Sequence, residues 1–243
     1  MAAPLPDFLG LGTQKGGTTT LHRLLGEHPE VFLPACKEVH FFDQNYSEGE
    51  AWYRQHFQGA RADQRCGDIT PFYLFHPDVP GRIHQHLPQA RMIVLLRDPV
   101  ERAISQVFHA QRLGFEPLPV AEALAAEDNR LATGDPYSFQ KHSYISRSRY
   151  LEQLDRYEAL FPPEQLLILC SEDLFAKPEQ IWHELLRFLK LKPIPWPGAL
   201  PRANAGDGLG ERVDPALRQQ LRRQLAHTVA GIESRYGIRW EWS

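Results

Sequence analysis

The stretch DFLGLGTQKGGTTTLHRLL, residues 7–25, decides the fold. The apolar FLGL (8–11) is typical of a short buried strand, and TTTLHRLLGEHP (18–29) begins with hydroxyl residues and ends at a glycine and a proline, as helices do. Lys15 and two glycines lie between them. A glycine-rich turn lets backbone N–H groups converge at a helix N-terminus, whose dipole favours negative charge. The stretch therefore predicts a strand, an anion-binding loop and a helix.

Strand and helix patterns alternate along the rest of the chain. RMIVLLRD (91–98) is the clearest strand, because its five consecutive apolar residues suit a strand covered on both faces. Asp98 is placed to cap the following helix, with Pro99 as its first residue. This alternation predicts an α/β fold: a single domain over residues 1–243, with a central parallel sheet flanked by helices. Further strands are expected at 31–33, 65–70 and 165–171, and further helices at 48–57, 76–88, 149–162, 178–191 and 214–234.

The composition excludes several classes of partner. The chain has 243 residues and a net charge of −3, with no long basic stripe, so no nucleic acid partner is expected. RQQLRRQ (218–224) is interpreted as a solvated helix face. No apolar run approaches the roughly 18 residues that span a bilayer, so no membrane partner is expected.

The three cysteines, Cys36, Cys66 and Cys170, are widely spaced and form no CxxC motif. A disulfide framework is therefore not expected, and a reducing compartment fits better. The N-terminal MAAPLPDF lacks the basic and apolar regions of a signal peptide. These observations predict a cytoplasmic protein.

The loop itself predicts phosphate chemistry. Lys15 adds a full positive charge, and Thr18, Thr19 and Thr20 add hydroxyl donors. The loop of nucleoside triphosphatases has the order GxxxxGK[ST], with the lysine after the second glycine. Here the lysine precedes the two glycines, so the lysine and the hydroxyl do not hold the places used for the β- and γ-phosphates and Mg²⁺.

This inverted order resembles the 5′-phosphosulfate loop of sulfotransferases, which bind 3′-phosphoadenosine-5′-phosphosulfate (PAPS). Three further segments resemble the heparan sulfate sulfotransferases: KEVHFFD (37–43), DITPFYL (68–74) and LLRDPVERAISQ (95–106). The helix–strand pattern of 149–174 is similar to the family's as well. The resemblance covers roughly residues 7–191 and implies a P-loop-like strand–loop–helix that binds PAPS as the sulfuryl donor.

The resemblance also implies roles for individual residues. Lys15 would meet the negative charge that develops on the leaving nucleotide, and Glu38 would act as general base toward a hydroxyl or amine acceptor. Arg97 and Ser105 would bind the 3′-phosphate. No metal is expected, since no metal-ligand spacing such as HExxH occurs. The loop residues expected to bind the donor are Lys15, Gly16, Gly17, Thr18, Thr19 and Thr20.

Alternatives remain for the candidate base. Glu38 can also be interpreted as a surface residue beside Lys37. His40 is a second candidate base because histidine titrates near neutrality. A core histidine beside Phe41 and Phe42 is the preferred interpretation of His40.

Alternatives also remain around the 3′-phosphate segment. Arg97 ends a buried strand, where an unpaired guanidinium is costly, so it needs either an anionic ligand or an internal partner. Asp98 and Glu101 are the internal candidates. Arg102 is expected to be an exposed helix residue.

Two departures from the family and two other function classes stay open. Ile69 stands where some heparan sulfate relatives have a second lysine, and RANAGDGLGER (202–212) has no lysine or cysteine. Arg202 or Arg212 would contact the 3′-phosphate if this loop closes over the nucleotide. The alternative functions are a P-loop kinase that uses Asp98 near Mg²⁺ and a non-catalytic nucleotide-binding protein. A carbohydrate or small-molecule acceptor is expected, of unspecified identity.

Overall fold

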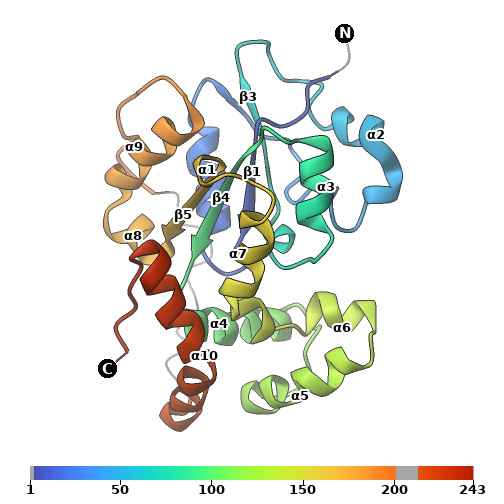
Figure 1. Cartoon of the computed structure of the whole chain (residues 1–243), viewed down its shortest axis with the longest axis vertical. Helices are drawn as coiled ribbons and strands as arrows, with labels where there is room; N and C mark the ends of the chain where they lie inside the picture. Colours follow the sequence, from blue (N-terminus) through green and yellow to red (C-terminus); the bar gives the residue numbers. More distant parts are fainter. Residues whose placement is uncertain (1–2, 201–212, 243) are drawn as a thin grey trace. The chain divides into compact units, whose positions relative to one another are not determined.

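The computed structural model describes residues 3–200 and 213–242. Its contacts divide the chain into two compact units. The first comprises residues 3–96 and 153–200, and the second comprises residues 97–152 and 213–242 (Figure 1). A single domain over the whole chain stays a prediction.

The first unit is built on a five-stranded, entirely parallel sheet with the order β2-β3-β1-β4-β5, which confirms the predicted α/β class. The chain runs from the central strand β1 to one side of the sheet and then to the other. The carboxyl end of β1 is therefore a topological switch point, where doubly wound sheets bind their ligands. The strands are β1 (Phe8–Gly12), β2 (Val31–Phe32), β3 (Arg65–Ile69), β4 (Arg91–Leu96) and β5 (Leu166–Cys170).

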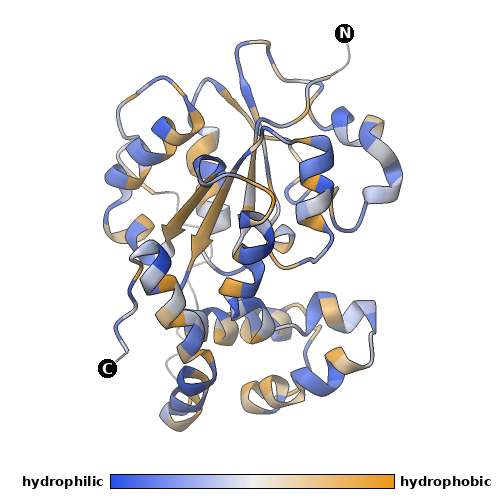
Figure 2. Cartoon of the chain, in the orientation of Figure 1, coloured by the Kyte–Doolittle hydropathy of each residue, from blue (hydrophilic) through white to orange (hydrophobic). Residues whose placement is uncertain are grey.

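Helices of the first unit pack on this sheet through apolar stripes. Leu21, Leu24 and Leu25 of α1 share a buried cluster with Ile93 of β4 and Trp182 of α9. Figure 2 shows β4 and β5 as hydrophobic along most of their length, whereas the helices alternate between hydrophobic and hydrophilic residues. The helices are α1 (Thr18–Gly26), α2 (Gly49–Gln55), α3 (Val79–His86), α8 (Ser171–Ala176) and α9 (Pro178–Leu189), and α7 (Tyr150–Glu158) enters from the second unit.

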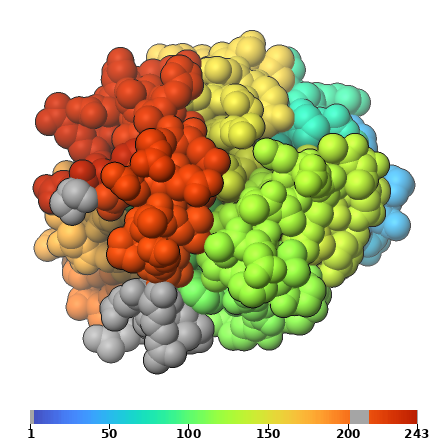
Figure 3. Space-filling model, turned by 90° about the horizontal axis from the view of Figure 1, so that it is seen from below, coloured from blue at the N-terminus to red at the C-terminus, as the bar shows by residue number. Residues whose placement is uncertain are grey.

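The second unit is helical in the part that the structure describes. As predicted, Asp98 caps α4: its Oδ1 accepts hydrogen bonds from the N–H groups of Val100 (2.8 Å) and Glu101 (3.0 Å). Two of its helices, α5 and α6, have no counterpart in the expectations from sequence. The space-filling view shows α10 and the α5–α6 segment at the surface (Figure 3). The helices are α4 (Pro99–Arg112), α5 (Val120–Ala132), α6 (Pro136–Lys141) and α10 (Pro215–Tyr236).

The prediction that Arg102 is exposed is wrong. Its side chain is 0% exposed and donates hydrogen bonds to Ser148 Oγ (2.7 Å), Gln106 Oε1 (2.6 Å) and the carbonyl of Tyr144. Burial lowers the pKa of this guanidinium. The reason is tertiary, because the segment that covers Arg102 lies about 40 residues further along the chain.

Arg202 and Arg212, proposed for the 3′-phosphate, lie outside the described residues. Within the parts of the chain that are described, no helix is long and apolar enough to cross a membrane. The three cysteines are free, as expected.

The close pairing of β1 with β3 gives a first testable prediction. Gly67 pairs with Phe8, and a Cβ at Gly67 would overlap the buried Phe8 ring. We expect Gly67→Ala to lower the free energy of unfolding by about 1–3 kcal/mol, as overpacking does. Urea denaturation measures the effect. The matched control is Gly81→Ala in α3, where nothing lies within 4 Å of the new methyl group.

The control is expected to raise stability by about 0.5 kcal/mol, because alanine is the better helix former. Equal stability of the Gly67→Ala variant and the wild type would show that β1 and β3 do not pack in this register.

Candidate functional site

The loop between β1 and α1 is tied to the neighbouring strand β4. The N–H and the hydroxyl of Thr13 both donate to the carbonyl of Leu95, each at 2.9 Å. Gly16 lies against the same atoms, since a Cβ at Gly16 would lie 2.5 Å from Thr13 Oγ1 and 2.7 Å from the Leu95 carbonyl oxygen. Only glycine fits this position without a shift of the backbone.

The end of the loop presents the N-terminus of α1. Lys15 (φ 68°) and Gly17 (φ 93°) are both in the left-handed region, which glycine adopts without strain. Gly17 occupies the N-cap position and has no side chain to cap the helix. The first N–H groups of α1 therefore project from the helix end, where an anion is favoured.

The residues predicted to bind the donor differ in their hydrogen bonds and in their exposure. The N–H of Gly16 donates to the Thr13 carbonyl at 2.9 Å, so it serves the loop's own conformation. The side chains of Thr18 and Thr20 are buried, whereas Lys15 and Thr19 are partly exposed. The Lys15 side chain is thus accessible beside the N-terminus of α1, and the role of the three hydroxyls in donor binding stays a prediction.

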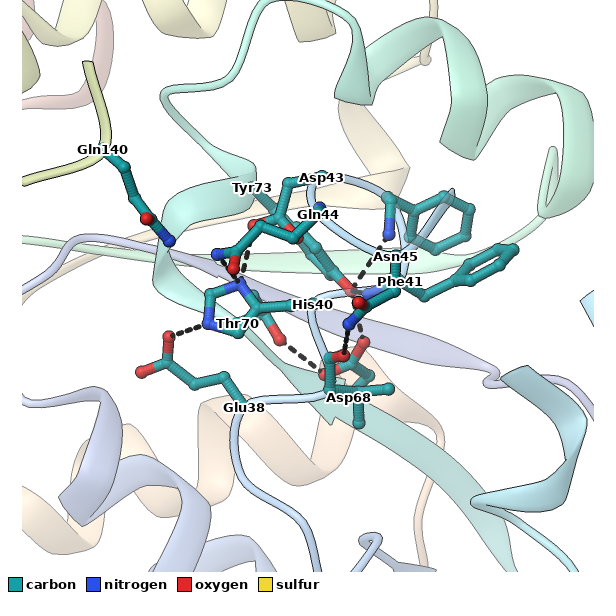
Figure 4. A network of polar contacts seen from close by, with 12 residues as sticks. Glu38, His40, Phe41, Asp43, Gln44, Asn45, Asp68, Thr70, Tyr73 and Gln140 are labelled. Atoms are coloured by element: carbon teal, nitrogen blue, oxygen red, sulfur yellow. Dashed lines mark hydrogen bonds and ion pairs between the residues drawn. The ribbon is translucent and has the colours of Figure 1, made fainter. Parts of the chain in front are cut away.

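A second part of the same unit brings two carboxylates to one imidazole (Figure 4). His40 Nε2 lies 3.2 Å from Glu38 Oε2, and His40 Nδ1 lies 2.8 Å from Asp43 Oδ2. Lys37 Nζ lies 3.7 Å from the other carboxylate oxygen, Glu38 Oε1. The core interpretation of His40 is therefore wrong: its ring pairs with carboxylates and is 24% exposed.

These two carboxylates decide the charge of His40. Burial by itself lowers the pKa of an imidazole, but the hydrogen bonds to Asp43 and Glu38 outweigh it and raise the pKa to about 9. At neutral pH the ring is an imidazolium that donates to both carboxylates. His40 is then not a proton acceptor, and it holds the Glu38 carboxylate in place.

Buried hydroxyls anchor this segment to the sheet. Asp68, at the carboxyl end of β3, is 0% exposed and accepts hydrogen bonds from the hydroxyls of Tyr53 (2.9 Å), Tyr73 (2.8 Å) and Thr70 (2.8 Å). Burial raises the pKa of this carboxyl, although the three hydroxyls oppose the shift. The Tyr73 hydroxyl also accepts the N–H of Phe41 at 2.8 Å.

The sequence analysis singled out DITPFYL (68–74) but gave no role to Asp68 and Tyr73 within it. A buried acid flanked by hydroxyl residues is recognisable only after folding. Ile69 is also explained: it is 2% exposed and its Cγ2 would lie 2.8 Å from a Cβ on Gly10, so this position belongs to the sheet core.

The 3′-phosphate candidates Arg97 and Ser105 belong to the second unit. Arg97 directly follows β4, is partly exposed, and accepts the hydroxyl of Tyr150 on its carbonyl at 2.8 Å. Ser105 lies on α4 and is also partly exposed. Glu101, one proposed internal partner of Arg97, forms an ion pair with Arg218 at 2.7 Å.

Asp98, the Mg²⁺ ligand of the kinase alternative, already uses both carboxylate oxygens. Oδ1 caps α4, and Oδ2 accepts the indole N–H of Trp242 at 2.6 Å. Among residues 3–200 and 213–242, no group of three or more His, Cys, Asp or Glu side chains is arranged to hold a metal ion.

The charge of His40 predicts a pH dependence of stability. Its pKa rises from an ordinary 6.5 to about 9 on folding, so its contribution is fully present below pH 6.5 and is lost as the pH rises through about 9. We expect the stability advantage of the wild type over His40→Gln to fall between these pH values, measured by urea denaturation.

Asn45→Ala provides the control. It removes a nearby hydrogen bond to the Val39 carbonyl (3.0 Å) but no titrating group, so its effect should stay constant over the same range. A constant difference between wild type and His40→Gln would contradict the paired imidazolium.

The family model described as "Sulfotransferase domain" matches residues 5–197. Human heparan sulfate glucosamine 3-O-sulfotransferase 3B1 is 33% identical over 191 residues, which cover 78% of this chain and 47% of the relative. The chain spans about half the length of the curated relatives it matches, for example 47% of this human enzyme and 59% of a membrane-associated sulfotransferase from Dictyostelium discoideum.

Solved structures of sulfotransferases also resemble this chain. A sulfotransferase from Alicyclobacillus acidocaldarius superposes with a TM-score of 0.82 at 28% identity, covering 98% of both chains. Mouse sulfotransferase SULT7A1, solved in complex with PAP, shares the fold at a TM-score of 0.60 and 14% identity, over 98% of this chain and 87% of the mouse chain. The loop, its lysine and the extent of these matches lead to one conclusion: the chain belongs to the sulfotransferase family.

Proposed function

We propose that the chain transfers the sulfuryl group of PAPS to a hydroxyl or amine of a carbohydrate or small-molecule acceptor. The observation that carries the proposal is the loop at the switch point of the sheet, which combines Lys15 with an uncapped helix N-terminus. Family membership supports the reaction class, and the PAP complex of the mouse protein with the same fold supports the donor.

The donor's groups match the chemistry of the residues proposed to hold them. The first turn of α1 would bind the 5′-phosphate through backbone N–H groups, and Gly16 and Gly17 allow the tight turn that leads into this helix end. The half-buried Arg97 and Ser105 would bind the 3′-phosphate. PAPS supplies an activated sulfuryl group on a phosphate leaving group.

The residues would then divide the work of transfer. Glu38 would accept the proton of the attacking hydroxyl or amine, because a positioned carboxylate can act as a general base. Lys15 would stabilise the charge that grows on the bridging oxygen as the bond from sulfur to that oxygen breaks. His40, held by Asp43, would orient Glu38.

The acceptor class rests on the relatives. The human relative's name specifies a glucosamine of heparan sulfate, which favours a glycan acceptor here. A cytoplasmic location stays a prediction. The kinase alternative is not favoured, because the lysine precedes the glycines and both Asp98 oxygens accept hydrogen bonds.

Calorimetric titration tests the donor class. We expect adenosine 3′,5′-bisphosphate to bind with micromolar affinity in the absence of divalent metal.

Lys15→Ala should lower turnover of PAPS by at least about 10²-fold, the scale of losing one charge-stabilising donor. Glu38→Gln should lower turnover by about 10²-fold or more while binding of the bisphosphate is retained, as expected for a base.

Binding of Mg²⁺–ATP alone would overturn the sulfotransferase proposal. Binding of the bisphosphate with no turnover of labelled PAPS, over a broad acceptor screen, would favour a non-catalytic nucleotide-binding protein.

The 3′-phosphate assignment has its own test. Arg97→Ala should weaken binding of adenosine 3′,5′-bisphosphate by about tenfold or more, the scale of a charge-assisted hydrogen bond. Binding of adenosine 5′-phosphosulfate, which lacks the 3′-phosphate, should change little. Arg239→Ala is the matched control, since this exposed arginine pairs with Glu233 at 2.7 Å in the same unit. Equal losses for both nucleotides would remove Arg97 from the 3′-phosphate site.

A further inference from the structure

His22 carries a buried nitrogen without a hydrogen-bond partner. Its Nε2 is one of two such side-chain atoms in the described part of the chain. Buried polar atoms are almost always paired, so an orphan of this kind needs an explanation such as a bound ligand or water. His22 lies on α1, four residues after Thr18. Side chains on a helix lean toward its N-terminus, so His22 lies over the first turn of α1.

The surroundings of this nitrogen are cationic. Burial, together with the positive charges of Lys37 and Arg23, lowers the pKa of His22 to about 4. The ring is therefore neutral at physiological pH, and in the tautomer with hydrogen on Nε2 it is a buried donor beside cations. Its missing partner is best supplied by an oxygen that carries negative charge.

Lys37 links His22 to the candidate base. Its side chain is 18% exposed, and its Nζ lies 3.7 Å from Glu38 Oε1. Burial lowers the pKa of Lys37, although Glu38 and Asp68 oppose the shift. One ammonium thus acts on the imidazole over the α1 terminus and on the carboxylate expected to face the acceptor.

These positions select one part of the donor. In an in-line transfer the sulfuryl group lies between the phosphate and the attacking atom. The phosphate belongs at the first turn of α1, and the attacking atom belongs beside Glu38. His22 lies over the first turn of α1 and Lys37 lies beside Glu38, so this pair would flank the sulfuryl group between the two places.

We propose that the Nε2–H of His22 and the ammonium of Lys37 bind the sulfuryl oxygens of PAPS. This inference rests on the proposed function. Neither residue gains or loses a proton: the bond from sulfur to the acceptor forms, the bond from sulfur to the bridging oxygen breaks, the electron pair leaves with the phosphate, and Glu38 takes the acceptor's proton.

Two nucleotides that differ by the sulfuryl group test the proposal by calorimetry without an acceptor. We expect His22→Phe to weaken binding of PAPS by about tenfold or more, the scale of a hydrogen bond to a charged group. Its affinity for adenosine 3′,5′-bisphosphate, which has no sulfuryl group, should stay within twofold of the wild type. Lys37→Met should show the same split, and kcat should fall in both variants.

Two further variants separate binding from structure. His22→Gln should recover part of the lost PAPS affinity, because its amide N–H can replace the imidazole donor. Arg23→Gln is the matched control, because it removes an exposed positive charge from the same helix without removing a buried donor, so any loss of affinity should be small and equal for the two nucleotides. If His22→Phe fails to fold, His22→Gln and Lys37→Met carry the test.

Equal weakening of both nucleotides would overturn the inference and assign His22 to the shape of the loop. Unchanged PAPS affinity in His22→Phe and Lys37→Met would overturn it as well. A wild-type chain that binds neither nucleotide would instead refute the proposed function, so the two failures are distinguishable.

Discussion

The double hydrogen bond from Thr13 to the Leu95 carbonyl is the interaction on which the candidate site depends. It attaches the loop after β1 to β4 at the switch point of the sheet. With this contact made, Gly16 has no room for a side chain, and the chain turns through Lys15 and Gly17 into α1. The direction of the α1 terminus is thus set by a backbone carbonyl of the sheet core rather than by a flexible side chain.

The buried carboxylate of Asp68 similarly holds the segment that carries Glu38, the candidate base. A carboxylate with no exposure is costly unless hydrogen bonds replace its hydration. Three hydroxyls supply them, and one of these, from Tyr73, also binds the N–H of Phe41. Because Glu38 and His40 lie within three residues of Phe41, the polar core of the first unit fixes the backbone near the candidate base.

The parallel sheet and the loop were predictable from the sequence because both depend on local patterns. Buried parallel strands are apolar runs, and an anion loop needs its glycines and lysine within a few residues. The states of His40 and Arg102 were not predictable. His40 next to two phenylalanines looks like core, and only the turn of the backbone brings Glu38 and Asp43 to its two nitrogens. The helical pattern around Arg102 indicates an exposed side chain, but its hydrogen bonds to Tyr144 and Ser148 depend on tertiary contacts that the local pattern does not contain.

The charges around Glu38 bear on its proposed role as the general base. Lys37 Nζ and His40 Nε2 both lie close to its carboxylate, at 3.7 Å and 3.2 Å. A carboxylate is a weak base toward a neutral hydroxyl, whose proton is far less acidic. In a loose transition state, bond formation to the attacking oxygen lags behind departure of the leaving group. The proton becomes acidic only as the new bond to sulfur forms, so a well-oriented weak base is sufficient. In the proposed transfer, the contacts from Lys37 and His40 would therefore serve to orient Glu38 rather than to make it more basic.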